Sequence, residues 1–397
     1  MREFRRIVES RPRITPKAPW GITKQIPQAS GQFSFAFPVA PPVRLQPQLF
    51  YGTLNGLNTF QNQFFPENVT GFEPELRPQS TQHFSVELQR NLGFDSVVSV
   101  AYVGNRQRHI SLTRNVNVVP FGARFNPANV DPTTGLPLSD NFLRPMIGLG
   151  NVSHIENIGT RNYDSLQVTG TRRYKNGLAF GGSYTLSKTT AMEGTLPLYL
   201  NDSWIDDHAN SDRRHQASVN ATWDLPRASQ AWDNAFVRAV LDHWQLAGVA
   251  IFVSGAPATV TFTTQVATDI LGGGDPGRID VTCDPMANAP RTFDRWFDTG
   301  CFALPGRGDV GSSNRQMIRL PGSADFDLTV SKNFPMGAAR RLQFRAELYN
   351  VLNHTNWTNV NTAAIFNAQG AQTNPQFGQV TAAGQPRVIQ LSLRFAF

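Results

Sequence analysis

The sequence has few charged residues and no long apolar run. Charged residues make up 16% of its 397 residues, whereas roughly 25% is usual in soluble proteins. Mean hydropathy is nevertheless −0.30, because Asn, Gln, Ser and Thr take the place of charged side chains. No stretch approaches the roughly 18 consecutive apolar residues of a transmembrane helix. This excludes a helical membrane protein but not a transmembrane barrel, whose strands need only about ten alternating residues.

Two targeting or binding signals are also missing. The opening residues, MREFRRIVESRPRITPKAPWG, are basic, but the apolar segment and cleavage site of a signal peptide do not follow. We therefore identify no export signal. The net charge is +7, yet the basic residues are dispersed and form no patch that would attract nucleic acid. Nucleic acid is not an expected partner.

Neither an enzyme nor a metal protein is expected. The chain has no Gly-x-Ser-x-Gly elbow and its histidines are scattered, so no nucleophile and base are placed to meet. The acidic stretch at residues 201–215, NDSWIDDHANSDRRH, lacks the spacing of a calcium loop. It is interpreted as a long loop whose charges are solvated or paired with its own arginines. LGGGDPG, at residues 271–277, lacks the Lys-Ser/Thr of a phosphate loop and predicts a flexible loop. No cofactor, catalytic residue or metal ligand is assigned.

Cysteine is scarce as well. Cys283 and Cys301 are the two cysteines of the chain and lie in one stretch rich in Gly and Pro. They are compatible with a loop disulfide in an oxidising compartment and with two free thiols. We favour the disulfide.

What the sequence does contain is a recurring two-residue alternation, which is typical of strands with one apolar and one polar side. It recurs in residues 84–89, 94–102, 165–169, 178–186, 215–225, 244–253, 325–331, 342–349 and 387–397. The first two segments form a hairpin that we expect to turn at 91–93. Asn176-Gly177 lies between two others, and this dipeptide is the strongest short hairpin signal.

The connections are short on one side only. Short turns are predicted at 91–93, 175–177 and 335–340, and long loops at 104–160, 187–212, 264–322 and 352–385. Outer-membrane barrels have short periplasmic turns and long extracellular loops, with lipid outside and a polar lumen. We therefore predict an all-β chain forming an antiparallel transmembrane β-barrel of outer-membrane type, partial, with roughly 10–14 strands. A soluble sheet protein is the alternative.

Some charged residues of the late strands fall on the polar side of the pattern. These are Asp325, Asp327, Arg345 and Glu347. We expect them to face the lumen; the alternative is that they pair across neighbouring strands.

Several stretches, in order, resemble the C-terminal barrel region of Oar-like TonB-dependent outer-membrane receptors. They are NYDSLQVTGTRRYKNGLAFGGSYTLSK, SDRRHQASVNATWDLP, HWQLAGVAIFVSGAP, RWFDTGCFALP, LPGSADFDLTVSKNFPMG, RRLQFRAELYNVLNHTNW and the terminal aromatic strand. The resemblance covers most of residues 75–397. It implies an irregular Pro-rich segment with the first barrel strands at 1–75 and the C-terminal part of the barrel at 76–397.

The resemblance also implies partners. Such barrels contact outer-membrane lipid, bind an extracellular ligand through their loops, and are assembled by a machinery that reads an aromatic last strand. In this chain that signal is Ile389, Leu391, Leu393, Phe395 and Phe397.

The chain departs from the family pattern, because it has about half the expected strands and neither a plug nor a TonB box. We expect contact with the TonB complex only through those missing N-terminal parts, as in a fragment of a split or truncated gene. The predicted function is uptake of an unidentified nutrient at the outer membrane. The alternative is a structural or adhesion barrel.

Overall fold

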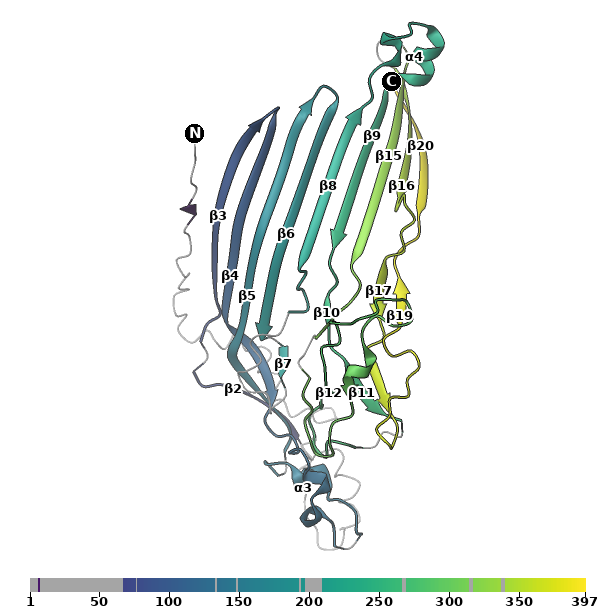
Figure 1. Ribbon diagram of the computed structural model, residues 1–397. Coiled ribbons are helices and arrows are strands. Elements are labelled where there is room, and N and C mark those ends of the chain that lie inside the picture. The colour runs from purple at the N-terminus through teal and green to yellow at the C-terminus, as the bar shows by residue number, and fades with distance from the viewer. Residues whose placement is uncertain are drawn as a thin grey trace, which may run out of the picture.

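One tall, mainly antiparallel sheet dominates the computed structural model, with irregular loops gathered at one of its ends (Figure 1). The structure describes residues 6–7, 67–75, 77–132, 134–147, 149–192, 194–196, 209–265, 269–313, 317–336 and 340–397. Most of the predicted irregular segment at 1–75 lies outside them. Within these ranges no helix has the length and apolar character to cross a membrane.

Nine long strands, each antiparallel to the next, form the body of the sheet. They are β3 (Ser80–Gly93), β4 (Ser96–Asn115), β5 (Leu149–Lys175), β6 (Leu178–Met192), β8 (His215–Asp224), β9 (Trp244–Val253), β15 (Ser323–Pro335), β16 (Arg341–Tyr349) and β20 (Val388–Ala396). Three short strands complete it: β1 (Arg6–Ile7) beside β3, β2 (Glu67–Phe72) beside β5, and β7 (Gly194–Leu196) beside β4. The described residues thus supply 12 strands to this sheet, which confirms the predicted class and lies within the predicted range.

The sheet has two chemically different faces, because residues paired across antiparallel strands point to the same side. We call one the apolar face. Its members include Phe84, Val86, Leu88, Val100, Tyr102, Leu166, Val168, Tyr184, Val219, Trp223, Leu246, Phe252, Phe326, Leu328, Phe344, Leu348, Leu391 and Leu393. Many of these side chains are exposed, including Leu393 at 66%. A face that stays apolar and uncovered over nine strands matches a wall that meets lipid.

The sheet is open within the described residues, where β20 pairs with β16 alone. At the other side, β3 pairs with β4 and, over two residues, with β1. Figure 1 shows these two edges on opposite sides of the molecule.

Two turns decide the registers of the first hairpins. Asn176 and Gly177 have φ of 52° and 81°, as a two-residue hairpin turn with the right twist requires, and the predicted turn is confirmed. The other hairpin turns at Phe94 and Asp95, with φ of 52° and 57°, rather than at 91–93. Asn91 does not turn the chain there; its Oδ1 accepts a hydrogen bond from Gly93 N instead.

Two strands run much further than the apolar pattern indicated. β4 continues to Asn115 and β5 begins at Leu149, so parts of the predicted 104–160 loop are strand. On the apolar face the change of character falls at Arg106, whose Nη2 lies 2.7 Å from Asp164 Oδ1. Beyond it the strands still pair, up to Asn115 with Ser153, because each satisfies the backbone groups of the other. The apolar pattern ends where the lipid contact would end, not where the strand ends.

The two ends of the sheet carry different connections, and we call them the short-turn end and the long-loop end. The short-turn end holds the turns after β3, β5 and β15 and the C-terminal end of β20, and α4 (Ala235–Leu241) lies at the same end (Figure 1). The long-loop end holds η2 (Ala123–Phe125), η3 (Pro127–Asn129), α3 (Asp140–Leu143), β10 (Pro257–Ala258), β11 (Thr261–Thr264), β12 (Asp280–Val281), η6 (Thr299–Cys301), β13 (Phe302–Ala303), β14 (Ile318–Arg319), β17 (Trp357–Val360), β18 (Ala363–Phe366) and β19 (Val380–Ala383).

Candidate functional site: the polar face and the long-loop assembly

The face opposite the apolar one is lined by hydroxyl and amide side chains, and we call it the polar face. Its pairs are joined by hydrogen bonds across strands: Ser99 Oγ and Thr169 Oγ1 are 2.6 Å apart, and Ser183 Oγ and Ser218 Oγ are 2.8 Å apart. Gln245 Nε2 donates to the carboxylate of Asp224 at 2.7 Å. Such a surface suits water rather than lipid, because unpaired polar groups are costly in hydrocarbon.

Arg345 and Glu347 lie on this polar face, on β16. The Arg345 Nη2 atom is 2.6 Å from Glu347 Oε1, and the two residues are separated by one position on the same strand, so they share a side of the sheet. The expected alternative was pairing across strands, but this ion pair forms along one strand. It places one charge of each sign together on the wall.

Asp325 and Asp327 lie on the polar face of β15, toward its long-loop end. Asn356 Nδ2 donates to Asp325 Oδ1 at 2.6 Å, and Asn350 N donates to Asp327 Oδ1 at 2.9 Å. Both asparagines belong to the loop that follows β16. The two carboxylates therefore orient the base of a loop, which the sequence did not suggest. The Arg345–Glu347 pair lies closer to the short-turn end, because Glu347 is paired with Thr329 and Arg345 with Ser331 of β15.

The two late loops fold together around one apolar core, which we call the loop core. Its buried side chains come from the loops between β9 and β15 and between β16 and β20: Val260, Ile279, Phe297, Cys301, Phe302, Ile318, Val360, Ala364, Phe366, Phe377 and Val380. Phe297 packs edge-on against Phe302 and Phe377, with ring centroids 5.6 and 5.3 Å apart. β11 and β18 join the loops as a parallel pair. The loops thus form a small folded unit.

Cys283 and Cys301 form a disulfide in this unit, with Cα atoms 5.0 Å apart. The carboxylate of Asp298 lies near the two sulfurs. Bonded sulfurs are not the thiolates that a metal requires, and the Asp298 carboxylate accepts a hydrogen bond from Gly300 N. Cys283, Cys301 and Asp298 therefore stabilise the loop structure and do not form a metal site.

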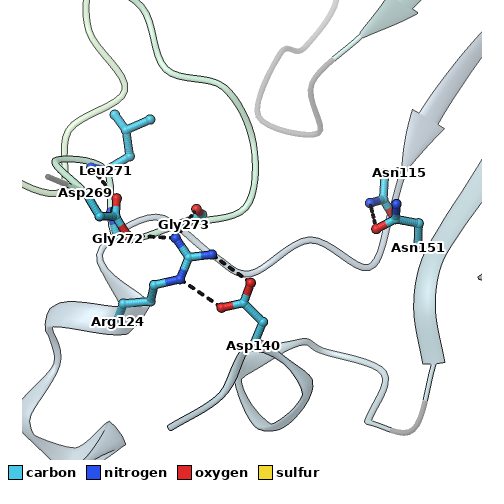
Figure 2. Close-up of polar contacts among 8 residues, drawn as sticks. All are labelled: Asn115, Arg124, Asp140, Asn151, Asp269, Leu271, Gly272 and Gly273. Atoms are coloured by element: carbon cyan, nitrogen blue, oxygen red, sulfur yellow. Dashed lines mark hydrogen bonds and ion pairs between the residues drawn. The ribbon is translucent and has the colours of Figure 1, made fainter. Parts of the chain in front are cut away.

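Arg124 ties the loop between β4 and β5 to the loop between β9 and β15 (Figure 2). Its Nε and Nη2 donate to the two oxygens of Asp140 at 2.8 and 2.7 Å. Its Nη1 donates to Asp269 Oδ2 at 2.7 Å and to the Gly273 carbonyl at 2.8 Å. The two carboxylates raise the pKa of Arg124, and the guanidinium lowers the pKa of Asp140. One side chain thus holds three segments together in a fork geometry that a lysine cannot reproduce.

The glycine run at 271–277 is packed against this junction and is not the loose loop that its composition suggested. Gly122 N donates to Leu271 O and Arg124 N donates to Gly272 O, at 2.8 and 3.0 Å. A Cβ on Gly272 would lie 2.7 Å from the Phe125 ring, and Gly272 has a φ of 61°. Glycine is needed because two backbones approach closely here. A glycine run without a phosphate-loop lysine can indicate such an approach.

Asp212, in the acidic stretch at residues 201–215, links two loops. It is fully buried, its Oδ1 accepts from Thr189 N at 2.7 Å, and its Oδ2 lies 2.5 Å from Arg319 Nη2. Arg319 belongs to the loop before β15, so Asp212 makes an ion pair outside the acidic stretch, which the sequence did not suggest. Residues 201–208 lie outside the described residues.

The terminal strand residues line the outer edge of the sheet. Ile389, Leu391, Leu393 and Phe395 pair in register with Leu348, Ala346, Phe344 and Leu342 on the apolar face. Phe395 and Phe397 lie with ring centroids 6.0 Å apart at the short-turn end. Phe397 is 94% exposed. The arrangement leaves this aromatic terminus accessible to another protein or to lipid.

Comparison with known proteins agrees with this architecture. Residues 10–390 match the model of a protein family described as "Outer membrane beta barrel domain". No curated protein matches.

Solved structures with a similar arrangement include three receptors or transporters. BauA, the ferric preacinetobactin receptor from Acinetobacter baumannii, is 14% identical with a TM-score of 0.38, and the match covers 81% of this chain and 30% of that one. The outer membrane transporter YddB from Escherichia coli is 10% identical with a TM-score of 0.36, and the match covers 83% of this chain and 34% of that one. The ferric-catecholate import receptor Fiu from E. coli is 10% identical with a TM-score of 0.37, and the match covers 82% of this chain and 28% of that one. The chain spans no more than about a third of the length of these three.

Proposed function

Because the chain belongs to the outer membrane beta barrel domain family, we propose that it forms part of the wall and the outer surface of a receptor that takes up a nutrient across the bacterial outer membrane. In this proposal the apolar face meets lipid and the polar face lines the lumen. The short-turn end faces the periplasm and the long-loop end faces the outside, as in other barrels of this membrane.

The observation that carries the receptor proposal is the folded long-loop end. Arg124 and the Asp212–Arg319 pair tie three loops to one another. The loop core joins the loop between β9 and β15 to the loop between β16 and β20, and the disulfide closes part of the first of these two loops. A binding surface whose parts are ordered before the ligand arrives loses less entropy on binding. The loops form such a surface at the long-loop end of the polar face.

The remaining roles are proposed from the resemblance to Oar-like TonB-dependent receptors. The partners are outer-membrane lipid, an extracellular ligand, and the barrel-assembly machinery that would read Ile389, Leu391, Leu393, Phe395 and Phe397. The TonB complex would act only through a plug and TonB box outside this chain. The proposal includes no catalytic step.

A growth experiment tests the uptake role. The gene is deleted in its host and growth is measured with iron, cobalamin, carbohydrate or peptide limiting in turn, with complementation by the unaltered gene and by Arg124→Ala. We expect slower growth on one limiting nutrient, the same deficit on loss of TonB, and partial rescue by Arg124→Ala. Equal growth of the deletion strain on every nutrient that requires TonB would reject uptake.

A structural or adhesion role is the second candidate, and the cross-linked loop core favours it, since a rigid surface unit also suits contact with other cells. Attachment assays with the same deletion strain separate the two. Loss of attachment with unchanged growth on all limiting nutrients supports adhesion.

A further inference from the structure

We propose that the connection between β8 and β9, residues 225–243, is a membrane anchor that lies on the phospholipid leaflet at the short-turn end. We call it the helical connection; it contains η5 (Ala228–Gln230) and α4. The proposal needs only that the apolar face of the sheet meets lipid. It is therefore independent of the proposed uptake function.

The helical connection is folded rather than loose. Asn234 caps α4, because its Oδ1 accepts a hydrogen bond from Val237 N at 2.8 Å. Asp242, which follows the helix, is buried, and its carboxylate accepts from both Ser229 N and Ser229 Oγ, at 3.0 and 2.5 Å. The hydrogen bond from Ser229 lowers the pKa of Asp242. The start and the end of the connection are thus joined, and α4 has a fixed position.

Two side chains from the apolar face hold the end of α4. Trp244 Nε1 donates to the Val240 carbonyl at 2.8 Å. Lys332 Nζ donates to the same carbonyl at 3.0 Å and to the Asp242 carbonyl at 2.7 Å. Trp244 and Lys332 are paired across β9 and β15 and point to the side of Leu246 and Val330. The C-terminal end of the helix is therefore attached through side chains of the apolar face.

Lys332 has the surroundings of a cation at a membrane boundary. Its side chain is buried, and its Nζ lies 5.0 Å from the Trp244 ring centroid and 4.9 Å from that of Phe334. The ammonium group donates to carbonyls at the C-terminal end of α4, where the helix dipole favours positive charge. A lysine with an apolar stem and aromatic neighbours is typical of the edge of the hydrocarbon layer.

An apolar stripe on the helical connection is exposed within the described residues. Trp232, Phe236 and Val240 follow one another at four-residue spacing, which places Phe236 and Val240 on one side of the helix, and they are 68%, 73% and 40% exposed. Arg238, two positions from Phe236, pairs with Asp233 at 3.4 Å. Large exposed apolar groups beside a charged side are typical of helices that lie in a membrane surface.

Lipid is the occupant that fits, because the stripe continues an existing lipid-contacting surface. Val240 is bound to Trp244, and Trp244 begins the apolar face of β9, which continues through Leu246. A protein partner would have to cover the helix and leave the adjoining wall to lipid. A lipid surface covers both without a break.

Spin-label accessibility tests the anchor. Phe236→Cys and Arg238→Cys are made singly in the full chain, labelled with a nitroxide and reconstituted in phosphatidylethanolamine–phosphatidylglycerol vesicles. The native cysteines are bonded to each other and do not take the label. Oxygen, which concentrates in lipid, and a water-soluble nickel complex are compared as relaxing agents. We expect the ratio of oxygen to nickel accessibility to be severalfold higher at position 236 than at 238.

Equal, water-like ratios at both positions would overturn the proposal, since α4 would then project into the periplasm. Trp232→Cys provides a second label on the stripe and should behave like Phe236→Cys. If the labelled Phe236→Cys chain does not give the circular dichroism spectrum of the unlabelled protein, the ratio measured for Trp232→Cys is compared with that for Arg238→Cys instead.

Discussion

Replacing Arg124 by alanine should loosen the contact between two long loops without disturbing the sheet. The substitution removes four hydrogen bonds to Asp140, Asp269 and the Gly273 carbonyl. It leaves two carboxylates facing each other across the junction, where the exposed fractions of their side chains are 43% and 36%. Water can therefore replace part of what is lost.

The expected loss is about 2 kcal/mol. Hydrogen bonds to charged groups contribute roughly 1.5–3 kcal/mol each when well shielded, but exposed ion pairs contribute roughly 0–1 kcal/mol. The Arg124 side chain is 28% exposed and its two carboxylate partners are 43% and 36% exposed, so we take a total for the four bonds that is close to the value for exposed ion pairs. A loss of about 2 kcal/mol in the free energy of local opening speeds amide exchange about 30-fold.

Hydrogen exchange followed by mass spectrometry measures this directly. The amides of Gly122, Arg124 and Gly274, which bond across the junction, should exchange about 30-fold faster in Arg124→Ala if opening is local. Arg124→Lys should give an intermediate value, because an ammonium cannot form the fork. Val380 N, bonded to Phe293 O in the loop unit, serves as the internal control. Unchanged exchange at the junction would refute the tether, and equal acceleration at Val380 would refute its local character.

Three further predictions concern charge, the disulfide and the last strand. The Arg124 guanidinium holds the pKa of Asp140 below 3.8, so this stabilisation is complete above about pH 4 and lost as the pH falls through the lowered pKa; in Arg124→Ala an NMR titration of Asp140 should return toward 3.8, and an unmoved midpoint would contradict the pairing. Replacing Cys283 and Cys301 by serine should destabilise the loop unit by about 3 kcal/mol, by the loop-entropy estimate for their separation. Proteolysis should become faster in the loop unit but not in the strands, and equal cleavage of the serine variant and the unaltered protein would contradict this prediction. Phe397→Asp should reduce the amount of chain assembled in the outer membrane while Arg394→Gln, on the other face of β20, leaves it unchanged; equal assembly of the two would reject the proposed signal.

The strands that carry the apolar face could be predicted from the sequence because one physical rule governs them. Phe326, Leu328 and Val330 are apolar at every second position since each faces the same side of the wall. The Asn176-Gly177 turn could also be predicted from the sequence, because both residues tolerate positive φ. Where the apolar pattern ends, at Arg106 and Asp164, the rule no longer applies, and the further course of β4 and β5 could not be foreseen.

The candidate site was less predictable because it depends on contacts between distant segments. Arg124 lies 145 residues from Asp269, and nothing in the local sequence of either marks the pair. The same is true of Asp212 with Arg319 and of β11 with β18. The helical connection was missed because α4 has only seven residues and too few turns for a helical period to emerge.

The central claim is that one face of this sheet meets lipid and the other meets water. Single cysteines placed along β16 and tested in outer membranes with a water-soluble maleimide examine it position by position. The account predicts labelling at residues 343, 345 and 347 and protection at 342, 344, 346 and 348, which face the apolar side. Uniform labelling along the strand, or the reverse alternation, would contradict it.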